Sequence, residues 1–462
     1  MASLLILLFL QAASLYPANG GVPFGEPGLK LVTGFNNTYP TDSEGRNGAV
    51  LGVGSLPLYL VFEGDVDQYR SEIPYLKTIL GPDEGASTRQ YAYGLGGVPL
   101  LTRSTKFLTQ LVNDAFDVAE KENVPVYFHL DPMYGFLANT EARPEDAPAK
   151  KYWEVPEMRE WLEFPDGGKL PNQIPRPWFN WGSWVSPAPA LPAFGSPPFL
   201  RFAEAQLRDG LATPIAQRLA RLHRMHREFL FAGVNVGWET HFLDNRGVDA
   251  KNPPEAVWPV EARGVRMQPW EVGGQTGYAS LYWMGWNPRR ISEEARRSNK
   301  TAGAVFDSLC FKAVHDYMEM LARTLVKAGL TPRQVFTHIV AISTVHPEAT
   351  NNFFEPAWVA VNPYSVPGFT MDNRGAAVYN LAVLKSQIAA AQPGQQQFGA
   401  IESYLANYRD EASFKANLRE TFDNGGVIKV LFGPFGKGTP YELDPQQNGA
   451  TRAILDWLAG MD

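Results

Sequence analysis

Short apolar stretches alternate with longer amphipathic stretches along most of the chain. The apolar stretches are rich in Val, Ile and aromatic residues, and most are continuous rather than alternating with polar residues. That pattern is typical of parallel strands that are covered on both faces. We predict eight such strands, at 56–64, 97–104, 124–131, 232–239, 335–343, 357–364, 397–403 and 426–433.

The amphipathic stretches between these strands have the apolar spacing of helices. The clearest lie at 105–122, 200–230, 303–329, 374–391, 410–422 and 449–460. Strands that alternate with helices eight times predict an α/β fold, a (β/α)8 TIM barrel that occupies residues 56–462. Residues 21–55 would precede the barrel as an N-terminal extension.

Two connections are much longer than the others, 132–199 after the third strand and 240–302 after the fourth. Both are rich in Pro, Gly and Trp, and their aromatic content argues against disorder. Long loops inside a compact domain are usually functional. In a barrel, the loops that follow strands build the active-site face. We therefore expect these two insertions to form walls around the site.

The first twenty residues have the pattern of a secretory signal peptide. An apolar block at Leu4–Leu10 is followed by small residues, and it is too short to span a bilayer. No Lys or Arg precedes the block, so a buried strand or a wrongly chosen start codon stays as the alternative. The prediction is a secreted or periplasmic/extracellular protein that does not contact a membrane after signal removal.

Composition excludes some classes of protein. Apolar residues make up 45% of the 462-residue chain and charged residues 19%, as in ordinary folded proteins. The net charge of −7 argues against nucleic acid as a partner, because phosphate binding needs a basic face. A single cysteine, Cys310, cannot form an internal disulfide, and we expect it to be a small buried apolar residue.

Motifs for metals and cofactors are missing. The seven histidines include no HExxH, and the pair in "HRMH" (223–226) lies on the helix that approaches the fourth strand. There is no GxSxG elbow, P-loop or dinucleotide fingerprint. "GLGG" (94–97) precedes a predicted strand, so we interpret it as a turn. We predict no metal and no cofactor.

Carboxylates follow the apolar stretches where barrel chemistry collects, at the carboxyl ends of strands. They are Glu63, Asp131, Glu239 and Glu402. A carboxylate at such a position costs stability unless it is paired or solvated. The fourth and seventh strands face each other across an eight-stranded barrel, so Glu239 and Glu402 can approach one another. Two carboxyl groups about 5–5.5 Å apart suit retaining glycoside hydrolysis.

At these positions the chain resembles the clan A glycoside hydrolases, which are retaining (β/α)8 enzymes, over roughly residues 56–460. The resemblance implies Glu239 as acid/base and Glu402 as nucleophile. It also implies that Arg103 of "LLTRS" ends the second strand and supports the nucleophile. His129 of "VYFHLD" would end the third strand, and Tyr364 of "VNPYSVPG", near the end of the sixth, would bond the nucleophile.

Two positions depart from the clan's pattern. Trp238 stands where the clan has Asn before the acid/base, and Asn235 or Asn362 would have to replace that Asn. "LFGPFG" (431–436) stands where the clan has a Trp at the end of the eighth strand, with Phe432 or Phe435 as its substitute.

Aromatic side chains on the long loops are candidates for sugar binding, because sugar C–H faces stack on Trp and Tyr. The alternative for each Trp is that it packs its loop against the barrel. The further candidate contacts are Asp131, Trp238, His241, Asn362, Trp181, Trp184 and Trp286. A second group of candidates consists of Trp153, Trp178, Trp283, Asp244 and His346.

The sequence thus predicts a secreted glycoside hydrolase that cleaves a poly- or oligosaccharide by a retaining double displacement. One alternative is an inverting glycosidase that pairs Asp131, Asp244 or Glu63 with one of the glutamates at about 6.5–9.5 Å. The other is a carbohydrate-binding barrel without activity, which the two departures suggest.

Overall fold

The computed structural model describes residues 57–81, 87–133, 144–166, 178–180, 185–187, 191–242, 275–341, 355–371, 381–404, 410–433, 442–444 and 448–461. The predicted signal peptide and N-terminal extension lie outside these ranges.

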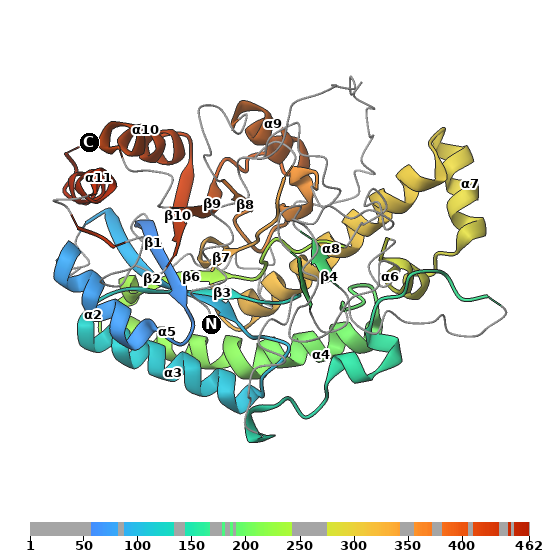
Figure 1. Cartoon of the computed structure of the whole chain (residues 1–462), viewed down its shortest axis with the longest axis horizontal. Helices are drawn as coiled ribbons and strands as arrows, with labels where there is room; N and C mark the ends of the chain where they lie inside the picture. The colour runs from blue at the N-terminus through green and yellow to red at the C-terminus, as the bar shows by residue number, and fades with distance from the viewer. Residues whose placement is uncertain are drawn as a thin grey trace, which may run out of the picture.

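Eight parallel strands form one sheet in the order β7-β6-β3-β2-β1-β10-β9-β8 (Figure 1). Their bounds are β1 Leu58–Asp65, β2 Arg89–Val98, β3 Val126–Leu130, β6 Phe231–Asn235, β7 Val335–Phe336, β8 Gly368–Thr370, β9 Phe398–Tyr404 and β10 Gly426–Phe432. The first and last strands of that order, β7 and β8, meet through parallel bridges at Phe336–Val366 and Ile339–Phe369. The sheet therefore curls round on itself, and the predicted (β/α)8 barrel is confirmed.

Helices lie outside the sheet, with α3 and α5 side by side along one flank and α10 packed on α11 along another (Figure 1). Their bounds are α2 Tyr69–Leu80, α3 Thr105–Glu122, α4 Pro197–Leu207, α5 Thr213–Arg224, α6 Tyr278–Trp283, α7 Pro288–Ser298, α8 Ala302–Lys327, α9 Leu381–Ala391, α10 Glu411–Phe422 and α11 Gly449–Leu458. None of the helices within the described ranges has the length and apolar character needed to cross a membrane.

Strand alternation divides the core in two. On β1, Tyr59 and Val61 point into the barrel, whereas Leu60 and Phe62 join the layer between sheet and helices. The same alternation turns Glu63 inward, and it is buried with 1% exposure. A charged group is thus placed in the barrel by the strand period itself.

Both long insertions carry secondary structure. A short antiparallel hairpin, β4 (Trp178–Asn180) with β5 (Val185–Pro187), lies in the first insertion. The helices α6 and α7 lie in the second, and α7 projects from the body of the molecule (Figure 1). The long helix predicted at 200–230 is interrupted: α4 and α5 are joined by a π-helical turn at Arg208–Ala212.

The second strand was predicted wrongly at 97–104. The structure has β2 at Arg89–Val98, and "GLGG" (94–97), which we interpreted as a turn, belongs to it. The glycines are required by Glu63: a Cβ on Gly96 would lie 2.9 Å from Glu63 Oε1. Beyond Pro99 the chain turns, with the Leu100 N–H donating to Val98 O.

The sixth strand was also predicted wrongly, at 357–364. That segment contains a 3-10 helix, Ala357–Ala360, in which Ala357, Val359 and Ala360 are buried. The strand is β8, which begins four residues after the predicted strand ends. There Gly368 approaches Thr337 so closely that a Cβ would lie 2.1 Å from Thr337 O. Prolines at 356 and 363 prevent the longer apolar stretch from joining the ladder.

Candidate active site

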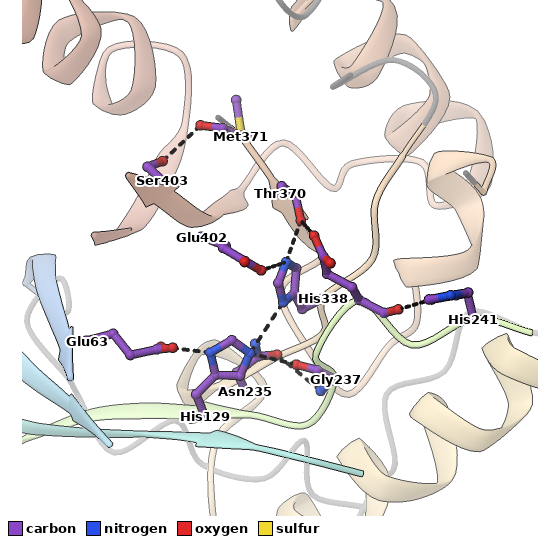
Figure 2. Close-up of polar contacts among 11 residues, drawn as sticks. Glu63, His129, Asn235, Gly237, His241, His338, Thr370, Met371, Glu402 and Ser403 are labelled. Atoms are coloured by element: carbon purple, nitrogen blue, oxygen red, sulfur yellow. Dashed lines mark hydrogen bonds and ion pairs between the residues drawn. The ribbon is translucent and has the colours of Figure 1, made fainter. Parts of the chain in front are cut away.

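Polar side chains fill the carboxyl end of the barrel, where its interior would otherwise continue as an apolar core. Figure 2 shows His338 between His129, Glu402 and Thr370, and Glu63 on the side of His129 that faces away from His338. Glu63 comes from β1, His129 from β3, Thr370 from β8 and Glu402 from β9. His338 follows β7 by two residues and keeps the inward direction of Phe336.

Glu402 is directed by an irregularity in β9. Lys429 of β10 pairs with Ala400 and Leu431 pairs with Ser403, so one extra residue of β9 lies between the two pairs. Glu402 takes a left-handed backbone conformation there, with φ at 57°. Its neighbour is held on the opposite side, because Lys429 Nζ donates to Ser403 Oγ (3.0 Å) and Ser403 Oγ donates to Met371 O (2.9 Å). A bulge of this kind re-aims a side chain near an active site.

Glu239 lies four residues beyond β6 and also has a left-handed backbone, with φ at 45°. Its turn is fixed by hydrogen bonds on both sides. The Gly237 N–H donates to Asn235 Oδ1 (3.2 Å), and His241 Nδ1 lies 2.5 Å from the Glu239 carbonyl oxygen. Burial lowers the pKa of His241 to about 4, so this ring is neutral at physiological pH and donates through Nδ1–H to the carbonyl.

The two glutamates face each other closely. One carboxylate oxygen of each, together with a ring nitrogen of His338, lie within 4.8 Å of one another. Thr370 Oγ1 donates to Glu239 Oε1 at 2.6 Å, and His338 Nε2 lies 3.7 Å from Glu402 Oε2. Glu402 has 6% exposure, whereas Glu239 is half-buried. The pair is thus enclosed by the barrel with Glu239 nearer to solvent.

A row of hydrogen bonds runs beneath the pair. His129 Nδ1 lies 2.7 Å from Glu63 Oε2, and His129 Nε2 lies 3.0 Å from Gly237 O and 3.3 Å from His338 Nδ1. His338 Nε2 is 2.8 Å from Thr370 Oγ1. Burial, together with the nearby His129, holds the pKa of His338 well below its usual value.

Trp238 closes one side of the barrel mouth. Its ring is 5.1 Å from that of His129 and 6.2 Å from that of Phe432. A Cβ on Gly97 would lie 3.0 Å from the Trp238 ring. The residue that replaces the clan's Asn, and the phenylalanine at the end of β10, therefore make one aromatic surface beside Glu239.

Three predicted site residues do not occupy the positions that the resemblance implied. Arg103 does not end a strand: it precedes α3, and its guanidinium lies over the Phe107 ring at 5.3 Å. Asn362 and Tyr364 precede β8 rather than ending it, and the Tyr364 N–H donates to Asn362 Oδ1. All three corrections follow from the displaced second and sixth strands.

Other predicted residues have structural contacts. Asp131 is buried and its Oδ1 accepts from the Met133 N–H. Trp286 packs on the core with Arg290 over its ring. Trp153 packs against Tyr152, and Trp283 against Trp161. The predicted positions Trp181, Trp184, Asp244, His346 and Phe435 lie outside the described residues, as does the side chain of Trp178.

Sequence reasoning missed His338 and Thr370. The signal for His338 was present, since it follows the inward Phe336 by two residues in "VFTHIV". No such signal marked Thr370, because β8 has three residues and was not recognised. Glu63 was predicted as a carboxylate at the end of a strand, but its contact with His129 was not predicted.

No protein-family model matches the chain, and no curated protein sequence matches it. Among solved structures it is similar to the PgaB (BpsB) glycoside hydrolase domain from Bordetella bronchiseptica, at 12% sequence identity and a TM-score of 0.37. That similarity covers 82% of this chain and 94% of that domain. The fold and the site by themselves define the class: a (β/α)8 barrel with a close pair of carboxylates at the ends of strands four and seven.

Proposed function

We propose that the protein is a glycoside hydrolase that cleaves a poly- or oligosaccharide with retention of anomeric configuration. One observation carries the proposal: an oxygen of Glu239 and an oxygen of Glu402 lie within 4.8 Å of each other at the barrel mouth. Retaining enzymes hold their two carboxyl groups about 5–5.5 Å apart, whereas inverting enzymes leave about 6.5–9.5 Å for a water molecule.

In the first step, Glu402 attacks the anomeric carbon and forms a C–O bond to it. The bond from that carbon to the glycosidic oxygen breaks, and Glu239 gives its proton to the departing oxygen. Glu402 suits attack because it faces the imidazole of His338 (3.7 Å) inside the barrel. Glu239 suits proton exchange because it is nearer to solvent.

In the second step, water attacks the same carbon and the bond to Glu402 breaks. Glu239, now ionised, takes the proton of that water and returns to its starting state. Two inversions at one carbon restore the original configuration. Trp238 and Phe432 give the sugar an apolar surface beside Glu239, which suits the C–H face of a ring.

The proposal includes secretion, which the apolar block at Leu4–Leu10 followed by small residues supports. Expression of the full chain in a secreting host, with N-terminal sequencing of the protein from the medium, tests this part by itself. A mature N-terminus within about the first 30 residues is expected for a signal peptide. An intact Met1 on protein retained in the cell would contradict it.

The assignment is tested by Glu402→Gln and Glu239→Gln, assayed on aryl glycosides of both anomeric configurations and on glucans, mannans and galactans. We expect Glu402→Gln to lower kcat by at least about a thousandfold and Glu239→Gln by about 10²–10⁴-fold on unactivated glycans. Glu319→Gln on α8 is the matched control, because Glu319 pairs with His315 away from the site. Full activity of either site variant contradicts the assignment.

The stereochemistry of the product separates the alternatives. NMR in the first minutes of reaction should show the substrate's own anomer, and the opposite anomer would identify an inverting enzyme. Azide identifies each role: Glu402→Ala with azide should give a glycosyl azide of inverted configuration, and Glu239→Ala one of retained configuration. Glycan binding with no turnover, unchanged in Glu402→Gln, would indicate a carbohydrate-binding barrel.

A further inference from the structure

The row of buried side chains beneath the two glutamates has no part in the double displacement as such. It runs from Glu63 through His129 and His338 to Thr370, and it ends on Glu239 Oε1. Glu63, His129 and His338 have at most 1% exposure and Thr370 has 8%. Four polar groups inside a barrel require a reason, since burying them costs free energy unless their hydrogen bonds are made.

The hydrogen-bond directions in this row follow from one backbone carbonyl. Gly237 O can only accept, so His129 Nε2, at 3.0 Å, carries a hydrogen. His338 Nδ1 lies 3.3 Å from the same Nε2, and two hydrogens would not fit between them. His338 Nδ1 is therefore an acceptor. His129 is held in this orientation at its other nitrogen by Glu63 Oε2 (2.7 Å).

The protonation state of His338 determines the direction of the hydrogen bonds from His338 to Thr370 and from Thr370 to Glu239. Because burial and His129 depress the pKa of His338, the ring is neutral, and its one hydrogen is on Nε2. Nε2–H donates to Thr370 Oγ1 (2.8 Å) and faces Glu402 Oε2. Thr370 Oγ1, having accepted from His338, donates its own hydrogen to Glu239 Oε1 (2.6 Å).

We propose that His338 and Thr370 are positioning residues that fix which oxygen of Glu239 carries its proton and hold Glu402 beside a neutral imidazole. This rests on the proposed function. Oε1 of Glu239 is occupied as an acceptor, so its exchangeable proton is confined to Oε2. His338 Nε2 lies 3.7 Å from Glu402 Oε2, so the ring holds a polar edge beside the nucleophile. Glu63 and His129 fix the tautomer of His338 from below.

Glu239, His338 and Glu402 lie close enough together for one cation to bind all three. The hydrogen-bond directions favour a proton instead, since a metal would need the lone pair at His338 Nε2 and that nitrogen carries the hydrogen.

A first test requires no substrate. In long-range proton–nitrogen NMR of protein with labelled histidine, His338 should be the neutral Nε2–H tautomer throughout about pH 5–8. Its signals are assigned by their loss in His338→Gln. An Nδ1–H tautomer, or protonation of His338 within that range, would overturn the proposal. So would a shift of these signals on adding stoichiometric Zn²⁺, which would assign the three groups to a cation.

The titratable groups around His338 are few and define the kinetic test. His129 faces it from β3, Glu402 from β9, and Glu239 from the segment after β6 through Thr370; Glu63 and Tyr127 lie behind His129.

Thr370→Val removes the donor to ionised Glu239 without changing side-chain shape. The pKa of Glu239 should rise, and the alkaline limb of the kcat/KM profile should move to higher pH.

In the same variant we expect kcat to fall about 10- to 100-fold with little change in KM, as for a lost hydrogen bond to a charged group. Thr370→Ser, which keeps the hydroxyl, should restore most of kcat and the original profile. Thr324→Val is the matched control, because the Thr324 hydroxyl bonds Met320 O within α8. A Thr370→Val profile that coincides with that of the parent would overturn the proposal.

His338→Gln and His338→Leu complete the test. Glutamine can keep an N–H near the place of Nε2, whereas leucine cannot. The leucine variant should lose more activity, and its acid limb should move to higher pH because an apolar side chain replaces the polar ring edge 3.7 Å from Glu402 Oε2. Equal activity and equal profiles in the two variants would contradict the role of His338. Failure of the proposed function and failure of this proposal can be told apart. If both glutamates prove dispensable for hydrolysis, the proposed function fails, whereas the NMR measurement still shows which tautomer His338 has.

Discussion

Glu239 and Glu402 share a backbone conformation that few residues with side chains adopt. Both have positive φ, at 45° and 57°, and each such residue costs about 1–3 kcal/mol unless its surroundings hold it. Here the surroundings do hold them, through His241 at the Glu239 carbonyl and the β9 bulge at Glu402. The two turns aim both carboxylates at the same point above the barrel axis.

Gly96 provides a test of the packing beneath that point. A Cβ there would lie 2.9 Å from both Glu63 Oε1 and Gly64 O. Gly96→Ala should lower the free energy of unfolding by about 1–3 kcal/mol, as overpacking does, and should lower kcat because Glu63 no longer holds His129. Thermal unfolding and the glycosidase assay measure the two effects.

The matched control for this substitution is Gly303→Ala, at the start of α8. There the nearest atom to a new Cβ is Thr301 Oγ1 at 4.0 Å, so stability should be unchanged or slightly raised. If Gly96→Ala unfolds at the same temperature as Gly303→Ala and keeps full kcat, Glu63 is not packed as described.

At the residue scale, the positions of the two glutamates could be predicted because each follows the apolar residues of a predicted strand and breaks them with a charge. Thr370 could not, because one hydroxyl in "VPGFT" has no pattern that separates it from an ordinary turn residue. Its partner across the mouth, Glu239, is 131 residues away in the chain. That contact depends on barrel closure and not on local spacing.

At the scale of elements, Glu160 joins the two long insertions. Its buried carboxylate accepts from the backbone N–H groups of Trp161, Gly277, Ala279 and Ser280, and from the Ser280 hydroxyl. The acceptor belongs to the first insertion, and three of the N–H donors surround the start of α6 in the second. This one carboxylate therefore links the first insertion to the start of α6 in the second.

This contact predicts a pH-dependent stability. Burial raises the pKa of Glu160 to about 7, against the lowering effect of its donors. The folded state then keeps a proton that the unfolded chain releases above its ordinary value of 4.5. The stabilisation is complete below that value and is lost as pH rises through about 7. From a shift of this size we expect a loss of about 3 kcal/mol.

Urea unfolding of the parent and of Glu160→Gln at several pH values measures this effect. The glutamine variant should lack this part of the pH dependence, because its amide does not titrate. A difference between the two proteins that stays constant from about pH 4.5 to 8 would contradict the role of Glu160.

Strands were predictable where no proline interrupts the strand itself, as for β1, β3, β6, β9 and β10. They were mispredicted where tertiary packing outweighed the local pattern. Gly94 and Gly96 look like turn residues, yet they lie in β2 because Glu63 requires the space. The 357–360 segment has the composition of a strand, yet most of its residues are buried in a 3-10 helix.

At the scale of the whole molecule, the barrel closes at the strands that carry His338 and Thr370. Four backbone bonds cross the closure, at 2.8–3.3 Å: Val366 N to Val335 O, Thr337 N to Val366 O, Ile339 N to Gly368 O and Thr370 N to Ile339 O. β7 has two residues and β8 has three, so short segments make this closure. The closure therefore also brings His338 within hydrogen-bond distance of Thr370.

Gly368→Ala tests that coupling. A Cβ at Gly368 would lie 2.1 Å from Thr337 O and 2.8 Å from Ile401 Cγ1, so β8 must move away from β7. We expect the free energy of unfolding to fall by about 3 kcal/mol, with faster amide hydrogen exchange at Thr337, Ile339 and Thr370. Activity should fall further than in Gly303→Ala, because displacement of β8 carries the Thr370 hydroxyl away from Glu239. A folded variant with fast exchange at these amides and unchanged kcat would show that the glutamates keep their protonation without the closure, and would separate the barrel's stability from its chemistry.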